Sequence, residues 1–146
     1  MHAILNKKLR SKMDKEINIA AHNHKIKQFY HEIQTWERLL DFFKQESVYL
    51  KTQLSEVVDQ LTGKEFLELA ENFQNRLIIK DEFIDELRHD VNDLKINLKS
   101  LFCTIENKYD EKLIKKQEML RNELENFKKE FTRDRIEFTK FLASIT

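Results

Sequence analysis

The sequence predicts an all-α fold, an elongated antiparallel bundle of three to four long helices with coiled-coil-like heptad packing. The first observation is that the 146 residues include one glycine and no proline, so the usual helix breakers are almost absent. The second is that charged residues make up 36% of the chain and apolar residues 40%, a balance typical of long amphipathic helices. Eleven phenylalanines supply the bulk for a packed core, which argues against a disordered chain.

The first long helix is predicted from a heptad pattern that ends near residue 61. In such a pattern the a and d positions form the buried seam between helices. Ten of these eleven positions are apolar, which is too regular for chance. The a positions are Ile26, Ile33, Leu40, Ser47, Leu54 and Leu61, and the d positions are Phe29, Trp36, Phe43, Leu50 and Val57.

A chain reversal is predicted at "LTGKEF", where the only glycine, Gly63, follows a candidate N-cap, Thr62. The heptad pattern then restarts and continues to Ile105, after which its phase slips. Such a slip is either a stutter in one continuous helix or a turn, and the capping residues in 106–110 favour a turn. A last helical segment is predicted to follow and to continue to Ile145.

Residues 1–18 leave two alternatives open. Leu5, Leu9 and Met13 are spaced by four, outside the heptad pattern, and the segment is basic. It forms either a separate short basic helix or arm, or a straight extension of the first long helix. The basic residues are Lys7, Lys8, Arg10, Lys12 and Lys15.

The predicted apolar faces are wider than a two-stranded seam requires. Phe42 and Tyr49 extend the face of the first helix, and Ile79 and Phe83 extend that of the second. A helix with a wide apolar face needs two neighbours, which favours a bundle over a dimeric coiled coil.

Three polar residues interrupt the predicted seams, and antiparallel pairing places them at one height. They are Ser47, Lys80 and Asp134. We expect a polar layer in which Lys80 and Asp134 form an ion pair with Ser47 nearby. Such a layer adds little stability but fixes register and partner choice. The alternative is that Lys80 extends outward to solvent and Asp134 marks a hydrated seam.

Metal binding is the main chemical alternative. Glu86 and His89 have the Glu-x-x-His spacing found in di-iron bundles, and Asp93 follows one turn later. Antiparallel pairing brings His31 within two turns of His89 in height. However, the chain holds one copy of the motif, and its heptad positions face solvent. We therefore assign no metal site, no cofactor and no catalytic residue from the sequence.

Composition limits the compartment and the partners. The formal net charge is zero, which gives no general attraction to nucleic acid or to an anionic membrane. One cysteine, Cys103, cannot form an internal disulfide, so a reducing compartment such as the cytoplasm is expected. No apolar run approaches a membrane span, so association with a membrane is not favoured.

Two stretches, "HEIQTWERLLDFFKQESVYLKTQLSEVV" and "ENFQNRLIIKDEFIDELRHDV", resemble a family of uncharacterised bacterial all-helical proteins. The resemblance covers residues 25–95, and the family offers no assigned activity. It implies a helical fold and suggests that His31, Glu32 and residues 73–75 are worth mutating.

The sequence therefore predicts a single helical domain over residues 1–146 with a non-catalytic, self-associating role in protein interaction or as a scaffold. Its expected partner is protein, with no nucleic acid and no small-molecule substrate. One alternative is a metal-binding bundle that uses Glu86 and His89 with help from His31. Another is a peripheral membrane protein that uses the basic N-terminus.

Overall fold

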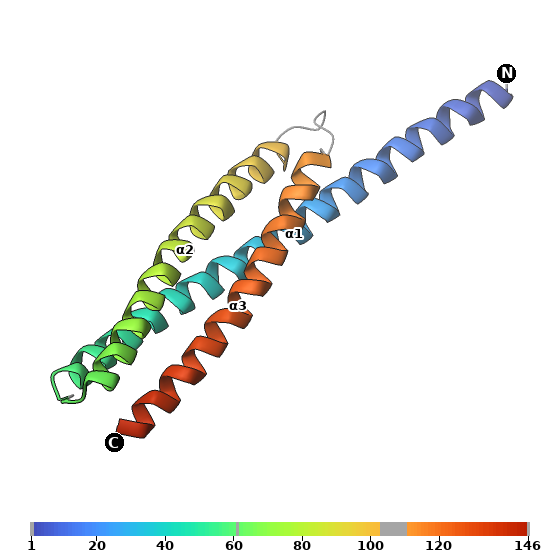
Figure 1. Ribbon diagram of the computed structural model, residues 1–146. Helices are drawn as coiled ribbons and strands as arrows, with labels where there is room; N and C mark the ends of the chain where they lie inside the picture. Colours follow the sequence, from blue (N-terminus) through green and yellow to red (C-terminus); the bar gives the residue numbers. More distant parts are fainter. Residues whose placement is uncertain (1, 61, 103–110, 146) are drawn as a thin grey trace.

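The computed structural model describes residues 2–60, 62–102 and 111–145, and these form a helical bundle (Figure 1). Helix α1 spans His2–Val58, α2 spans Lys64–Phe102 and α3 spans Glu111–Ile145. No strand occurs among these residues. The predicted all-α bundle is confirmed, with three helices in the described part of the chain.

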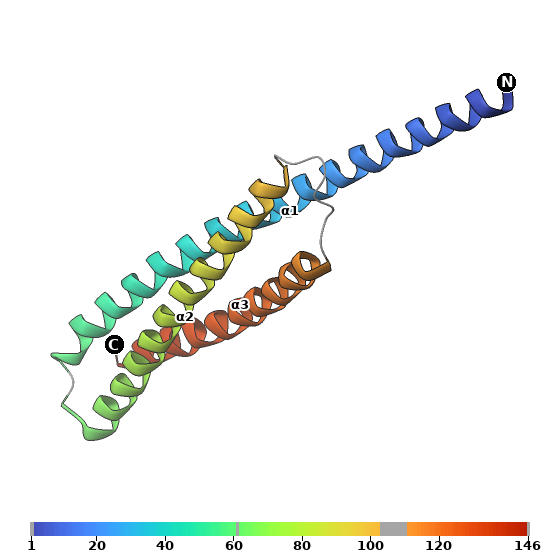
Figure 2. The ribbon, with the colours of Figure 1, turned by 90° about the horizontal axis from the view of Figure 1, so that it is seen from above.

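The three helices alternate in direction along an elongated molecule (Figures 1 and 2). Helix α1 has 57 residues and so is about 85 Å long at 1.5 Å per residue. Successive partners of α1 run backwards along α2 and forwards along α3, so α1 is antiparallel to α2 and parallel to α3. The pairs are Glu37–Lys95, Lys51–Asp81, Glu32–Arg121 and Glu46–Arg135.

The predicted seam positions form the core. Each helix contributes residues at the a and d spacing, and almost all of them are buried. Phe127 of α3 lies at the centre, with its ring centroid 5.2 Å from that of Phe43 on α1 and 5.6 Å from that of Phe83 on α2. Other core residues are Ile33, Leu40 and Leu54 of α1, Leu77, Ile84, Leu87 and Leu98 of α2, and Leu124 and Phe138 of α3.

The residues that widen the apolar faces remain substantially exposed. Phe42, Tyr49 and Ile79 keep 48%, 55% and 63% of their surface in contact with solvent. The three described helices therefore bury the centre of each stripe and leave its flanks open.

The first reversal lies where the sequence predicts it, but its cap is shifted by one residue. The Leu67 amide donates to the Gly63 carbonyl at 3.1 Å, which makes Gly63, and not Thr62, the residue that opens α2. Gly63 does not adopt a left-handed backbone conformation. A Cβ atom at this position would lie 3.2 Å from Cδ2 of Phe66, so the ring leaves little room for a side chain.

The second reversal is shown by the direction of the helices that flank it. Arg76 of α2 contacts Glu137 of α3, and Lys80, further along α2, contacts Glu130, which comes earlier in α3. These helices are thus antiparallel, so the phase slip does not mark a stutter in one continuous helix. The predicted turn at 106–110 lies outside the described residues.

Residues 2–16 belong to α1, so the alternative of a separate short helix over residues 1–18 is wrong. The helix continues from His2 to Val58, because neither glycine nor proline interrupts it. It extends past the ends of α2 and α3 in both views (Figures 1 and 2). We call residues 3–16 the N-terminal extension.

The central position of Phe127 leads to a stability prediction. We expect Phe127→Ala to lower the free energy of unfolding by about 3–5 kcal/mol, because a 1% exposed ring leaves a cavity between three helices. Urea unfolding monitored by circular dichroism measures the change. Phe42→Ala is the matched control, with an expected loss of about 1 kcal/mol because its ring is 48% exposed. Equal losses for the two variants would contradict the central role of Phe127.

Candidate functional site

The residues proposed for metal binding lie on exposed faces and do not converge. His89 Nε2 lies 3.5 Å from Oδ2 of Asp93, and both side chains are mostly in solvent. Glu86 is also exposed. His31 lines a pocket with Lys99, ten residues beyond His89, or about 15 Å further along α2 at 1.5 Å per residue. Within the described residues, the structure does not bring His31 together with Glu86 and His89 as a ligand set, and their joint role in metal binding stays a prediction.

A search for metal-ligand sets gives the same result. Within residues 2–60, 62–102 and 111–145, no three side chains of His, Cys, Asp or Glu are grouped to hold a metal ion. Cys103 lies outside the described residues. The donor geometry thus gives no support to the metal-binding alternative.

The predicted ion pair between Lys80 and Asp134 is present, but it belongs to a larger network. Lys80 Nζ lies 4.0 Å from Asp134 Oδ2, at the outer limit of an ion pair, and donates to Glu130 Oε2 at 2.6 Å. Arg76 Nη1 lies 3.7 Å from Asp134 Oδ1. The side chains of Lys80 and Asp134 are only 15% and 14% exposed, whereas those of Arg76 and Glu130 are 41% and 52% exposed, so the network extends from the seam to the surface. The hydrogen bond from Lys80 lowers the pKa of the Glu130 carboxyl.

Ser47 lies at the predicted height without joining this network. Its neighbour in sequence, Glu46, forms an ion pair at 3.1 Å with Arg135, the residue that follows Asp134. Ser47 itself is completely buried, and its hydroxyl has no hydrogen-bond partner in the described part of the protein. Ser47 therefore forms no hydrogen bond with Lys80 or Asp134.

A second polar cluster, which includes the fully buried Gln117, was not predicted from the sequence. Glu32 of α1 receives hydrogen bonds from Arg121 Nε at 2.9 Å and from Arg121 Nη2 at 2.7 Å. Gln117 is fully buried and donates to Oε1 of Glu32 at 2.9 Å. Burial alone would raise the pKa of the Glu32 carboxyl, but these hydrogen bonds outweigh it and lower the pKa below its ordinary value.

One sequence signal could have found this cluster. Gln117 occupies an a position, and Glu32 and Arg121 occupy g and e positions, which commonly pair across neighbouring helices. Their pairing requires the parallel alignment of α1 and α3, which neither predicted turn fixes directly.

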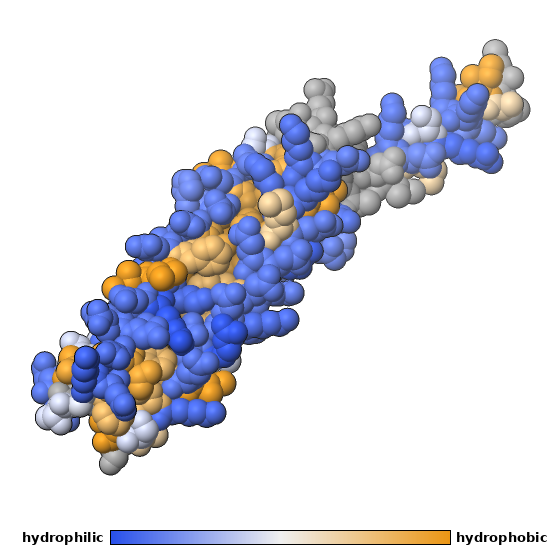
Figure 3. Space-filling model, in the orientation of Figure 1, coloured by the Kyte–Doolittle hydropathy of each residue, from blue (hydrophilic) through white to orange (hydrophobic). Residues whose placement is uncertain are grey.

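The N-terminal extension is exposed along its whole length. Residues 3–16 are all exposed, and Ile4, Leu5, Leu9 and Met13 keep between 52% and 65% of their surface in solvent. The space-filling view shows apolar residues at its tip and hydrophilic residues along most of its length (Figure 3). Five basic and two acidic residues lie in this segment. It therefore combines an unburied apolar stripe with an excess of positive charge.

A groove of opposite charge lies between α2 and α3. We call it the acidic groove, and its volume is about 180 Å³. Three carboxylates and one lysine line it together with apolar side chains. Its residues are Asp90, Asp93, Leu94, Asn97, Lys116, Met119, Leu120 and Glu123, and Met119 is 61% exposed.

The lowered pKa of Glu32 predicts a pH-dependent contribution to stability. The folded state stabilises the ionised form of Glu32 more than the unfolded state does. The contribution of Glu32 to the free energy of unfolding is therefore complete above the ordinary pKa of 4.5 and is lost as pH falls through the lowered pKa. We expect the difference in unfolding free energy between the wild type and Glu32→Gln to shrink from pH 6 to about pH 2. Urea titrations across this range measure it.

Arg121→Met provides the matched background for this test. It removes the main partner of Glu32, so the effect of Glu32→Gln should change less with pH there. A Glu32→Gln effect that is independent of pH in the wild-type background would contradict the prediction.

Comparison with protein-family models, with curated proteins and with solved structures found no match to this chain. The resemblance to a family of uncharacterised bacterial helical proteins therefore stays a prediction. None of the described helices has the length and apolar character that crossing a membrane requires.

Proposed function

We propose that this protein is a non-catalytic, cytoplasmic interaction module that self-associates through its N-terminal extension. One observation carries the proposal: α1 continues past the bundle as a helix whose apolar residues remain mostly exposed. Exposed apolar residues at regular spacing on a helix are typical of docking elements. A scaffold role follows from the same surface.

The acidic groove of a second copy is the partner surface that matches the extension best. The extension carries an excess of three positive charges, and the groove carries an excess of two negative charges. Leu5, Leu9 and Met13 can cover Met119 and Leu120 once the charges bring the two surfaces together. Pairing two extensions with each other would instead juxtapose like charges.

The position of the groove favours exchange between two copies. Glu32 contacts Gln117 and Arg121, and Glu37 contacts Lys95, so the groove lies level with residues 32–37 of α1. The extension points away from its own groove because α1 is continuous. Two antiparallel α1 helices that cross near residue 21 would bring residues 5–10 of each copy level with the groove of the other. Both interfaces of such a dimer are the same, which closes the assembly.

We expect the full chain to show a mass that rises with concentration towards a dimer, and Lys7→Glu/Lys8→Glu/Lys12→Glu to stay monomeric. Reversal of three charges converts attraction to the groove into repulsion. Sedimentation equilibrium measures both masses. Lys128→Glu/Lys129→Glu, on the exposed face of α3, is the charge-matched control and should associate like the wild type.

A complementary variant tests the groove itself. Asp90→Lys/Asp93→Lys should also be monomeric alone. Mixing it with Lys7→Glu/Lys8→Glu/Lys12→Glu should form a heterodimer, because the extension that is now acidic faces a groove that is now basic. A full chain that remains monomeric up to about 1 mM would contradict self-association, because this corresponds to a binding free energy weaker than about −4 kcal/mol.

A second candidate function is peripheral binding to an anionic membrane. It rests on the excess of basic residues beside the apolar residues of the extension. We expect flotation with vesicles that contain anionic lipid, and loss of flotation when residues 1–16 are deleted. Equal flotation with neutral vesicles, or no change on deletion, would contradict this function.

A further inference from the structure

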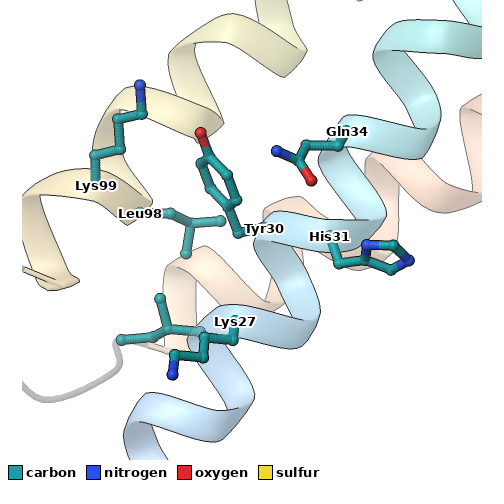
Figure 4. A pocket seen from close by; sticks show the side chains of 7 residues that line it. Lys27, Tyr30, His31, Gln34, Leu98 and Lys99 are labelled. Carbon is teal, nitrogen blue, oxygen red and sulfur yellow. The ribbon is translucent and has the colours of Figure 1, made fainter.

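A second pocket lies between α1 and α2, near the end of the bundle from which the extension projects. Five of its seven lining residues come from α1 and two from α2, and its volume is about 440 Å³. That volume falls in the range of roughly 300–1,000 Å³ typical of small-molecule sites. The lining residues are Ile26, Lys27, Tyr30, His31, Gln34, Leu98 and Lys99 (Figure 4).

The inner wall of this pocket is apolar. Ile26 and Leu98 are 2% and 1% exposed, and the Tyr30 ring stands beside Leu98 in the close-up view (Figure 4). The amide of Gln34 points towards Tyr30, whereas the His31 ring points away from it. A ligand therefore needs an apolar portion that packs against Ile26 and Leu98. The polar atoms of Tyr30 and Gln34 would lie beside that portion.

The rim of the pocket is cationic and carries unpaired charge. Lys99 lies above and Lys27 below Leu98 in the close-up view, and none of the seven described residues that line the pocket is acidic (Figure 4). In the described part of the chain, neither lysine forms an ion pair, although Lys95, one turn from Lys99, is paired with Glu37 at 3.2 Å. Lys99 Nζ lies 6.0 Å from the Tyr30 ring centroid, which holds the ammonium near the mouth.

We propose that this pocket binds a free single-chain amphiphile with an anionic head group. The alkyl chain of the ligand packs against the apolar wall, and Lys27 and Lys99 bind its anionic head group at the mouth of the pocket. The pocket accommodates one small molecule, so the ligand enters as a monomer and not as part of a bilayer. The proposal is one of binding and includes no chemical step. It is independent of the proposed self-association, because the acidic groove lies between α2 and α3.

Three probes that share one chain and differ in head group test this site. Monomeric dodecanoate is anionic, dodecanol is neutral and dodecyltrimethylammonium is cationic. We expect isothermal titration calorimetry to show one dodecanoate per chain, bound at least about tenfold more tightly than the other two probes, a difference equivalent to about 1.4 kcal/mol. Equal binding of the three probes, or no binding of dodecanoate, would overturn the proposal.

Charge variants connect the binding to the rim. Lys27→Gln/Lys99→Gln should weaken dodecanoate binding about tenfold, and Lys27→Glu/Lys99→Glu should weaken it further. Both lysines are exposed, so the helical content should stay unchanged by circular dichroism. Lys128→Glu/Lys129→Glu is the matched control and should bind like the wild type. Binding that is insensitive to the rim variants, or that occurs only with anionic vesicles, would overturn the proposal.

Discussion

The fold depends on the exclusion of water from one apolar seam that three helices share. Each helix contributes one apolar stripe to this shared core. Phe43, Phe83 and Phe127 bring rings from all three helices into contact, so loss of one helix would expose the stripes of the other two. Because apolar burial is non-directional, this seam explains compaction but does not choose between alternative alignments of the helices.

Charged residues beside the seam determine the relative alignment of the helices, which apolar burial alone does not fix. Ion pairs connect α1 to α2, α1 to α3 and α2 to α3. Exposed pairs of this kind contribute little to stability, whereas mismatched charges would disfavour a shifted alignment. The cluster of Glu32, Gln117 and Arg121 includes the fully buried Gln117, so it constrains the position of α3 along α1.

The sequence was sufficient for the core because heptad spacing reports burial directly. The sequence predicted Thr62 as the N-cap of α2, whereas the structure has Gly63 there. Both residue types are acceptable N-caps, so the sequence did not separate two positions one residue apart. The sequence did not decide whether residues 1–18 continue α1 or form a separate helix. Local sequence shows that both segments can be helical but not whether a turn separates them. Lys80 was placed at the correct height, yet Glu130 became its closest partner, since a shift of one helical turn changes which charge is nearest.

The candidate sites were harder to predict than the core. Glu32 and Arg121 are 89 residues apart, so their pairing depends on the alignment of two helices that no single turn connects. The acidic groove and the pocket at Tyr30 likewise combine residues from two helices. Residue spacing describes one helix at a time, and these surfaces exist only once two helices are placed beside each other.

The continuity of α1 also has a consequence for the thermodynamics of recognition. Starting a helix in water is unfavourable, whereas adding residues to an existing helix costs little, and a free segment of 14 residues would be marginally helical. The bundle supplies the nucleus, so the extension only has to propagate it. A binding partner would then meet a segment whose backbone is already ordered, and much of the entropy of folding on binding would be lost before the encounter.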